Sequence, residues 1–220
     1  MTMISDIRAS GAENLRESIF VYTNATPGTG IASTSNSATF VATNALINIF
    51  NSATVAAGNN QWIIPVSIIM TATAVNTSAT NFRLYGVLDG INRYSSGGTA
   101  LTAVTSAVDT RSGYTARTAK GTVYVGALTL AAASAAKPVF NRVVSPVIFA
   151  VDDSIQIWFG SGSAYGSAST QSKFCEVVPM VSIGRGCNLS VHGVGASQAA
   201  SPDFEFEITT IESGHPRFDS

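Results

Sequence analysis

The strongest strand signal in this chain is the segment QWIIPVSIIMTAT at residues 61–73. Trp62, Ile63 and Ile64 open a dense apolar run, and aromatic and β-branched side chains of this kind favour a β-strand. The turn signal AAGNN at residues 56–60 comes directly before it. Pro65 has no backbone N–H group, so we expect either an edge strand or a β-bulge at this position.

This strand lies inside a long uncharged stretch. No Asp, Glu, Lys, Arg or His occurs from Ser18 to Phe82, a stretch of 65 residues in a chain that is 11% charged overall. The apolar runs are too short for a membrane-spanning helix, and disordered chains usually combine low hydrophobicity with high net charge. We therefore expect a β-rich segment that packs largely against other protein.

Short β-type segments recur along the rest of the chain, with turn signals every ten or so residues. This pattern is typical of an all-β, antiparallel β-sandwich or jelly roll. The further strands that we expect lie at residues 18–23, 38–43, 45–50, 81–88, 121–130, 139–151, 154–159, 174–183, 188–191 and 204–208. Of these, 139–151 is either a strand pair or one strand bent around Ser145-Pro146. Residues 93–117 and 160–172 are rich in Gly and Ser and are predicted to be long loops. Trp62 and Trp158 are predicted to lie in the core.

Charge divides the chain into three parts. Five charged residues fall in the first seventeen, so we expect an N-terminal arm at 1–17, a jelly-roll β domain at 18–212 and a polar tail at 213–220. Residues 1–11 lack the apolar region of a signal peptide. The net charge of −1 favours association, and nine Arg against three Lys is typical of interfaces.

The sequence does not point to an enzyme, a cofactor or a metal site. His192 and His215 are the two histidines, and we interpret His192 as a strand-end imidazole. Cys175 and Cys187 are interpreted as separate thiols rather than zinc ligands. Asp152 and Asp153 are expected to cap a turn, and Asp203, Glu205 and Glu207 to form a solvated strand face. No basic run that could bind nucleic acid is present.

Arginines and loop tyrosines are the residues that we expect at an interface, because both types are enriched where proteins meet. The candidates are Arg8, Arg16, Tyr94, Arg111, Tyr114, Arg117 and Tyr165.

The chain resembles bacteriophage virion proteins of the jelly-roll capsid decoration (cement) type. The resemblance lies in uncharged strands such as QWIIPV at residues 61–66, in the loop GINRYSSGG at 90–98, and in the passage VSPVIFAVDDSIQIWFG at 144–160. It implies a non-enzymatic homotrimer on the outer capsid surface of the virion, made in the host cytoplasm, with an arm that reaches neighbouring subunits. The partners would be further copies of the chain and the major capsid protein, with no nucleic acid and no membrane.

Three other interpretations stay open. In a fibre or spike, the chain would be a receptor- or glycan-binding module, with loops 93–117 and 160–172 carrying Tyr94, Tyr114 and Tyr165 at an exposed tip. A glycan hydrolase would need two well-placed carboxylates, and the thirteen acidic residues do not indicate a pair. The fourth interpretation is a bacterial adhesin or a pilin-like subunit.

Overall fold

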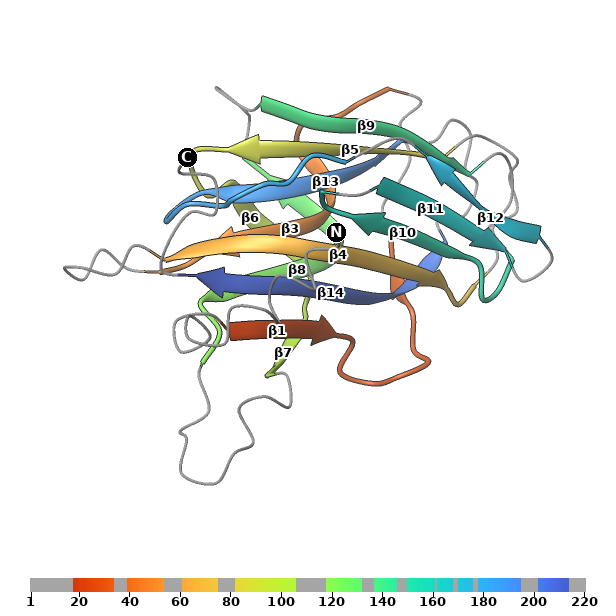
Figure 1. Cartoon of the computed structure of the whole chain (residues 1–220), viewed down its shortest axis with the longest axis horizontal. Coiled ribbons are helices and arrows are strands. Elements are labelled where there is room, and N and C mark those ends of the chain that lie inside the picture. Colours follow the sequence, from red (N-terminus) through yellow and green to blue (C-terminus); the bar gives the residue numbers. More distant parts are fainter. Residues whose placement is uncertain are drawn as a thin grey trace.

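The computed structural model is all-β, and two antiparallel sheets pack against each other as a β-sandwich (Figure 1). The residues that it describes are 18–33, 39–53, 61–74, 82–105, 118–131, 137–145, 150–160, 162–167, 170–175, 178–194 and 202–213, and no helix occurs among them. The predicted arm at 1–17 and residues 214–220 of the predicted tail lie outside these residues.

The first sheet has eight strands. Along the sheet the order is β12-β11-β10-β4-β14-β1-β7. The short strand β2 pairs with the first two residues of β14. The strands are β1 (Ser18–Thr23), β2 (Ile31–Ala32), β4 (Trp62–Ala72), β7 (Thr102–Thr105), β10 (Ser154–Trp158), β11 (Gly162–Ser167), β12 (Thr170–Cys175) and β14 (Asp203–Ser213).

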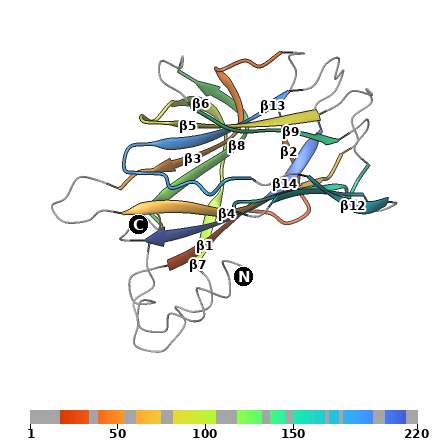
Figure 2. The same ribbon diagram turned by 45° about the horizontal axis from the view of Figure 1, so that its top comes forward.

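The second sheet has six strands in the order β6-β8-β3-β13-β5-β9. The strands are β3 (Asn44–Asn51), β5 (Phe82–Asp89), β6 (Tyr94–Ala100), β8 (Gly121–Leu130), β9 (Lys137–Ser145) and β13 (Asn188–Val194). Figure 2 shows the two sheets as separate layers.

Four antiparallel pairs join strands from opposite ends of the chain, progressively closer in sequence. β1 pairs with β14, β3 with β13, β4 with β10, and β5 with β9. Successive pairs alternate between the two sheets. These eight strands therefore follow the path of one long two-stranded ribbon that wraps around the core.

β4 is a central strand, so the edge-strand alternative for Pro65 is wrong and the bulge alternative is confirmed. β4 lies between β10 and β14. The register with β14 shifts where Pro65 pairs with Thr210 and Ser67 with Thr209, which leaves Val66 as the extra residue. A bulge accommodates the missing N–H group of Pro65 inside a paired strand.

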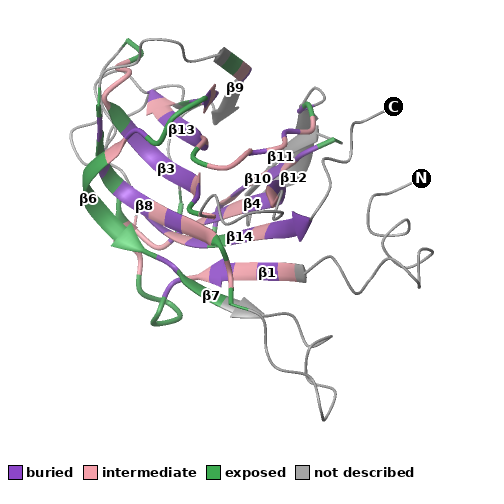
Figure 3. Ribbon diagram, turned by 90° about the vertical axis from the view of Figure 1, so that its left-hand side faces the viewer, coloured by how far each residue is buried: buried purple, intermediate pink, exposed green. Residues whose placement is uncertain are grey.

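The core lies between the inner faces of the two sheets. Phe204, Phe206 and Ile208 of β14 are buried there, while the alternating Glu207 is exposed. The predicted division of this strand into an apolar and a polar face is thus confirmed. Figure 3 shows the buried residues along the central strands β3, β4, β8 and β14.

One side of the sandwich is bridged by the chain from β6 to β7. β6 pairs with β8 in the six-stranded sheet, and β7 pairs with β1 in the eight-stranded sheet. Leu101 lies between them, is buried, and donates its backbone N–H to Val123 O at 2.9 Å. On this side the chain therefore passes directly from the six-stranded sheet to the eight-stranded sheet.

Two segments predicted as loops contain strands. β6 and β7 occupy much of the predicted loop 93–117, and β11 and β12 occupy most of 160–172. In β6 the left-handed backbone at Gly97 and Gly98 goes with register shifts against β8, so a Gly-rich segment follows the sheet edge through bulges. Strand propensity depends on the neighbouring strand as much as on the residue itself.

Three predicted strands are longer than the structure has them. Residues 39–43 form no strand, and a backbone bond from Asn44 N–H to Val41 O at 3.1 Å closes a turn there. Of 174–183, only the first two residues belong to β12, and 178–183 makes isolated bridges at Val178 and Ile183. Of 139–151, residues up to Ser145 belong to β9, and 146–149 lie outside the described residues.

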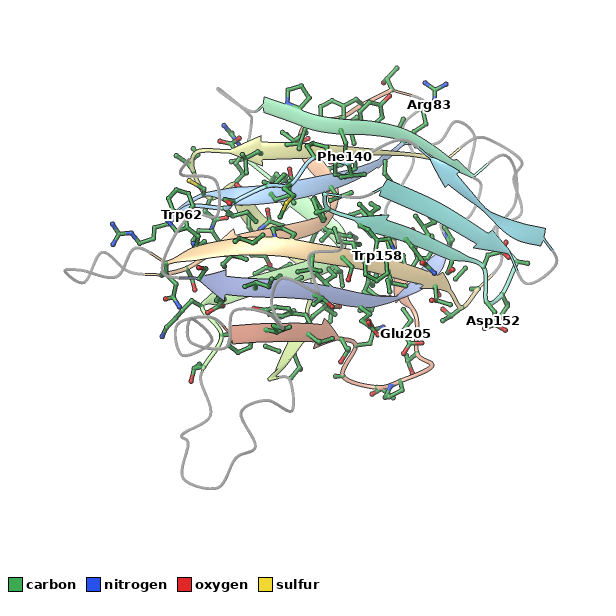
Figure 4. The ribbon with its side chains drawn as sticks, viewed as in Figure 1. Trp62, Arg83, Phe140, Asp152, Trp158 and Glu205 are labelled. Carbon is green, nitrogen blue, oxygen red and sulfur yellow. The ribbon has the colours of Figure 1, made fainter. Side chains whose placement is uncertain are left out.

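The prediction that both tryptophans are core residues is wrong, because each is only partly buried. Trp62 lies at one end of the sandwich, against Gly184, and Trp158 lies over the eight-stranded sheet (Figure 4). The indole N–H of Trp158 donates to Gln156 Oε1 at 3.4 Å.

Candidate functional site

The outer face of the six-stranded sheet carries a cavity of about 340 Å³. Strands β5 and β13 form its floor, and the 39–43 segment, the turn after β5 and the start of β9 form its walls. The lining residues are Phe40, Ala42, Tyr85, Val87, Asp89, Arg93, Leu130, Pro138, Ser190 and His192. This volume lies within the range of small-molecule sites, which is about 300–1,000 Å³.

The register of β5 against β13 sets the floor. Tyr85 stands opposite His192, and Val87 stands opposite Ser190. Side chains alternate between the faces of a strand, so these four point away from the core, while Leu84, Leu189 and Val191 point into it. The floor therefore mixes two rings, a hydroxyl and an aliphatic side chain.

Phe40 forms an aromatic wall over this floor. Its ring centroid lies 4.8 Å from that of His192 and 5.6 Å from that of Tyr85, with tilted planes in both pairs. Phe40 is 42% exposed, although large apolar side chains usually lie inside. One part of the side chain therefore contacts the floor, and the rest faces solvent.

His192 is held as a neutral imidazole. Its Nδ1 lies 2.7 Å from Asn44 O and its Nε2 lies 3.0 Å from Ser190 Oγ. A carbonyl oxygen can only accept, so Nδ1 carries the hydrogen and Nε2 accepts from the hydroxyl. Burial lowers the pKa of His192, and hydrogen bonds to the backbone at Asn44 and Val41 partly oppose this shift.

An oriented imidazole bonded to a serine hydroxyl is also the pairing of base and nucleophile in covalent catalysis. Here Ser190 and His192 are each 2% exposed, and Ser190 Oγ also lies 3.4 Å from Val87 O. These contacts satisfy buried polar groups of the cavity floor, and we assign the pair no catalytic step.

A buried ion pair closes one end of the cavity. Arg93 Nε donates to Asp89 Oδ2, and both side chains are almost fully buried. Asp89 Oδ1 accepts from Ile91 N–H at 3.3 Å, and Arg93 Nη1 donates to Ala131 O at 3.3 Å. The pair thus fixes the turn after β5 and ties it to the end of β8.

A row of buried amides extends from this ion pair across the sheet. Arg93 N–H donates to Asn188 Oδ1 at 3.2 Å, and Asn188 Nδ2 donates to Asn48 Oδ1 at 2.8 Å. Asn48 stands opposite Ser190, and its Nδ2 has no hydrogen-bond partner among the described residues. The polar network therefore runs from the cavity floor toward β8.

A second buried carboxylate lies at one end of the sandwich, away from the cavity. Glu212 Oε1 accepts from the backbone N–H groups of Lys120 at 2.5 Å and Gly121 at 2.8 Å. Burial and the Glu212 charge raise the pKa of Tyr22, whose hydroxyl donates to Gly121 O at 3.1 Å. These hydrogen bonds join β14 and β1 to the start of β8, and we interpret the network as one that stabilises the fold.

Two of the residues predicted at an interface lie in described strands. Tyr94 stacks on Tyr124 with centroids 4.0 Å apart and planes 8° apart, and its hydroxyl donates to Gly97 O at 2.9 Å. Tyr165 belongs to strand β11, opposite Ile155, rather than to a loop. Arg8, Arg16, Arg111, Tyr114 and Arg117 lie outside the described residues.

The acidic residues singled out in the sequence lie at one end of the eight-stranded sheet, where Figure 4 labels Asp152 and Glu205. Asp153 Oδ2 accepts from Ala150 N–H at 2.9 Å, which confirms the predicted turn. Glu205 Oε1 accepts from Gly28 N–H at 3.1 Å. In the part of the chain that the structure describes, no group of three or more potential metal ligands comes together.

Cys187 is a free thiol before β13. Burial, with the Asp89 charge, raises its pKa, so the thiol is protonated at neutral pH. Cys175 is the last residue of β12 in the eight-stranded sheet, and its side chain is not among those that the structure describes.

The edge strands on the two sides of the sandwich differ in their content of charged residues. On one side, the edge strands β9 and β12 contain Lys137, Arg142 and Lys173. On the bridged side, β6 and β7 contain no charged residue from Tyr94 to Thr105. We call this segment the uncharged edge; Figure 3 shows β6 as exposed along its length.

Comparison of the chain with protein-family models, with curated proteins and with solved structures finds no match. Among the described residues, no helix is long and apolar enough to cross a membrane. The function is therefore inferred from the residues and their geometry.

Proposed function

We propose that this chain is a non-enzymatic structural protein of a bacteriophage virion, one that decorates the capsid shell and clamps its subunits. It would lie on the outer capsid surface and contact further copies of itself, as a homotrimer, and the major capsid protein. The uncharged edge is the observation that carries this proposal.

The strand order supports a jelly roll. A jelly roll is an eight-stranded double sheet built from two Greek keys. The pairs β1–β14, β3–β13, β4–β10 and β5–β9, which alternate between the sheets, are those of an antiparallel ribbon wrapped in this way. β6, β7 and β8 would then be an insertion between β5 and β9, and β11 and β12 an insertion before β13. Capsid proteins and lectins both use this architecture.

The uncharged edge supports assembly through the insertion. An edge strand exposes unpaired N–H and C=O groups, and proteins usually protect such edges with charged side chains, Lys above all. The edge strands of the opposite side, β9 and β12, contain Lys137, Arg142 and Lys173, whereas β6 and β7 contain no charged residue. A neighbouring subunit that covers β6 and β7 would make charges there unnecessary and costly to bury.

Two measurements test the proposal. Light scattering at several concentrations gives the mass of the purified protein, and co-sedimentation follows its binding to capsids that lack it. A stable trimer that binds those capsids and raises their resistance to heat supports the proposal. An oligomer that ignores the capsids argues against it.

A receptor- or glycan-binding module of a fibre or spike is the second candidate. The observation that favours it is the cavity beside Phe40 and Tyr85, rather than the tyrosines of the predicted loops, since Tyr94 is stacked against Tyr124.

A further inference from the structure

We propose that the cavity on the outer face of the six-stranded sheet binds a single neutral sugar ring. This inference does not depend on the proposed capsid role. It rests on the second candidate function, glycan binding, and names its site and ligand class. Its failure would leave capsid binding through the uncharged edge unaffected.

The cavity offers aromatic surface to the apolar side of a sugar ring. The C–H groups of a pyranose form an apolar face that packs against aromatic rings, which combine large contact area with a polar rim. The ring centroid of Phe40 lies 4.8 Å from that of His192 and 5.6 Å from that of Tyr85, and all three rings line the cavity. Val87 and Pro138 add aliphatic surface beside them.

The same space has polar groups of both kinds. The carboxylate of Asp89 and the hydroxyl oxygen of Ser190 accept hydrogen bonds, the guanidinium of Arg93 donates them, and the hydroxyl of Tyr85 can do both. All four residues line the cavity. Sugar hydroxyls act as donors and acceptors at once, so a lining of mixed polarity suits them better than it suits an apolar ligand. A few convergent polar groups in an apolar pocket are the usual means of orienting a ligand.

The charge of the lining selects a neutral ligand. Asp89 and Arg93 neutralise each other as a buried pair. The lowered pKa of His192 keeps the imidazole neutral at pH 7. A carboxylate or ammonium group on the ligand would lose its hydration without gaining a counter-ion, and such burial is costly. Neutral hexoses should therefore bind better than uronic acids or amino sugars.

Phe40 is the residue that separates binding from folding. It is 42% exposed and lies just before the turn that Val41 and Asn44 close, so its removal should leave the core intact. Val151 is the matched control, because it is a large apolar residue, 47% exposed, that does not line the cavity.

The experiment is saturation-transfer NMR with the full chain and four probes: methyl glucoside, methyl galactoside, glucuronic acid and glucosamine. We expect at least one neutral glycoside to bind with a dissociation constant of about 1 mM, since a single ring recovers little more than the cost of association. Phe40→Ala should weaken that binding about tenfold, whereas Phe40→Trp and Val151→Ala should leave it within about twofold.

No binding of either neutral glycoside would overturn the proposal. Equal binding by Phe40→Ala and the unmodified protein would also overturn it, because the sugar would then bind elsewhere. Stronger binding of glucuronic acid or glucosamine would overturn the selection of a neutral ligand. Capsid co-sedimentation of the same variants is expected to be unchanged, which keeps the two proposals distinguishable.

Discussion

Gly86 of β5 leaves the space that the ring of Phe140 on β9 occupies. The two residues stand opposite each other, and a β-carbon at Gly86 would overlap three atoms of that ring. Phe140, labelled in Figure 4, is buried and packs edge-on against Phe159 with centroids 6.2 Å apart. The glycine is therefore required by packing between neighbouring strands, because its backbone is otherwise ordinary.

Gly86→Ala should destabilise the protein by about 1–3 kcal/mol, since overpacking forces side chains out of their rotamers. Denaturant unfolding measures the change. Adding Phe140→Leu should recover part of the loss, because the two sites are in contact and their effects do not add. Gly90→Ala is the control, since a β-carbon there meets nothing within 4 Å. Equal effects at Gly86 and Gly90 would contradict this explanation.

The sequence predicts the fold class and the faces of several strands well. In β5 the alternation places Leu84 and Gly86 on one face and Tyr85 and Val87 on the other, as the structure has them. Periodicity carries this information because it depends on local burial alone. Strand pairing depends on contacts between distant segments, so one sequence does not reveal that Tyr85 faces His192.

The site could not be found from the sequence for the same reason. The β-forming neighbours of Phe40 predict a strand, whereas the chain turns at Val41–Asn44 and Phe40 lies over His192. His192, which the sequence predicts at a strand end, lies inside β13 two residues from Ser190, and Asn44 becomes its neighbour only when β13 pairs with β3. Asp89-Gly90, a dipeptide typical of turns, is a local sequence signal beside the site.

Acid should destabilise the protein through His192. The imidazole has a folded-state pKa below its ordinary value of 6.5, so in the window below pH 6.5 the unfolded chain binds a proton that the folded chain does not. The stability that His192 contributes is therefore complete above pH 6.5 and is lost as the pH falls toward the folded-state pKa, by at most about 1.4 kcal/mol per pH unit.

Unfolding of the unmodified protein and of His192→Gln at pH 7.5, 6.5 and 5.5 measures this contribution. Asp89 and Arg93 line the same cavity and are present in both proteins. We expect the unmodified protein to lose more stability on acidification than the variant. Parallel pH profiles would show that His192 is protonated without cost.

Asp89→Asn should destabilise the protein by about 3–5 kcal/mol, because it leaves the buried cation of Arg93 without its counter-ion. The double variant Asp89→Asn, Arg93→Met should be more stable than the single variant, since it removes the unpaired charge. Glu207→Gln is the surface control and should change stability by less than about 0.5 kcal/mol. A double variant no better than Asp89→Asn would place the loss in the turn rather than in the charge.

Thr99→Lys should weaken assembly if the uncharged edge is a subunit contact. Thr99 is an exposed residue of β6, and a lysine on an edge strand opposes pairing with a further strand. Thr26→Lys adds the same charge to an exposed turn of the other sheet and serves as the control. Light scattering should give a smaller mass for Thr99→Lys and an unchanged mass for Thr26→Lys. If both variants keep the mass of the unmodified protein, subunits associate through another surface, and the lack of charge on β6 and β7 needs a different cause.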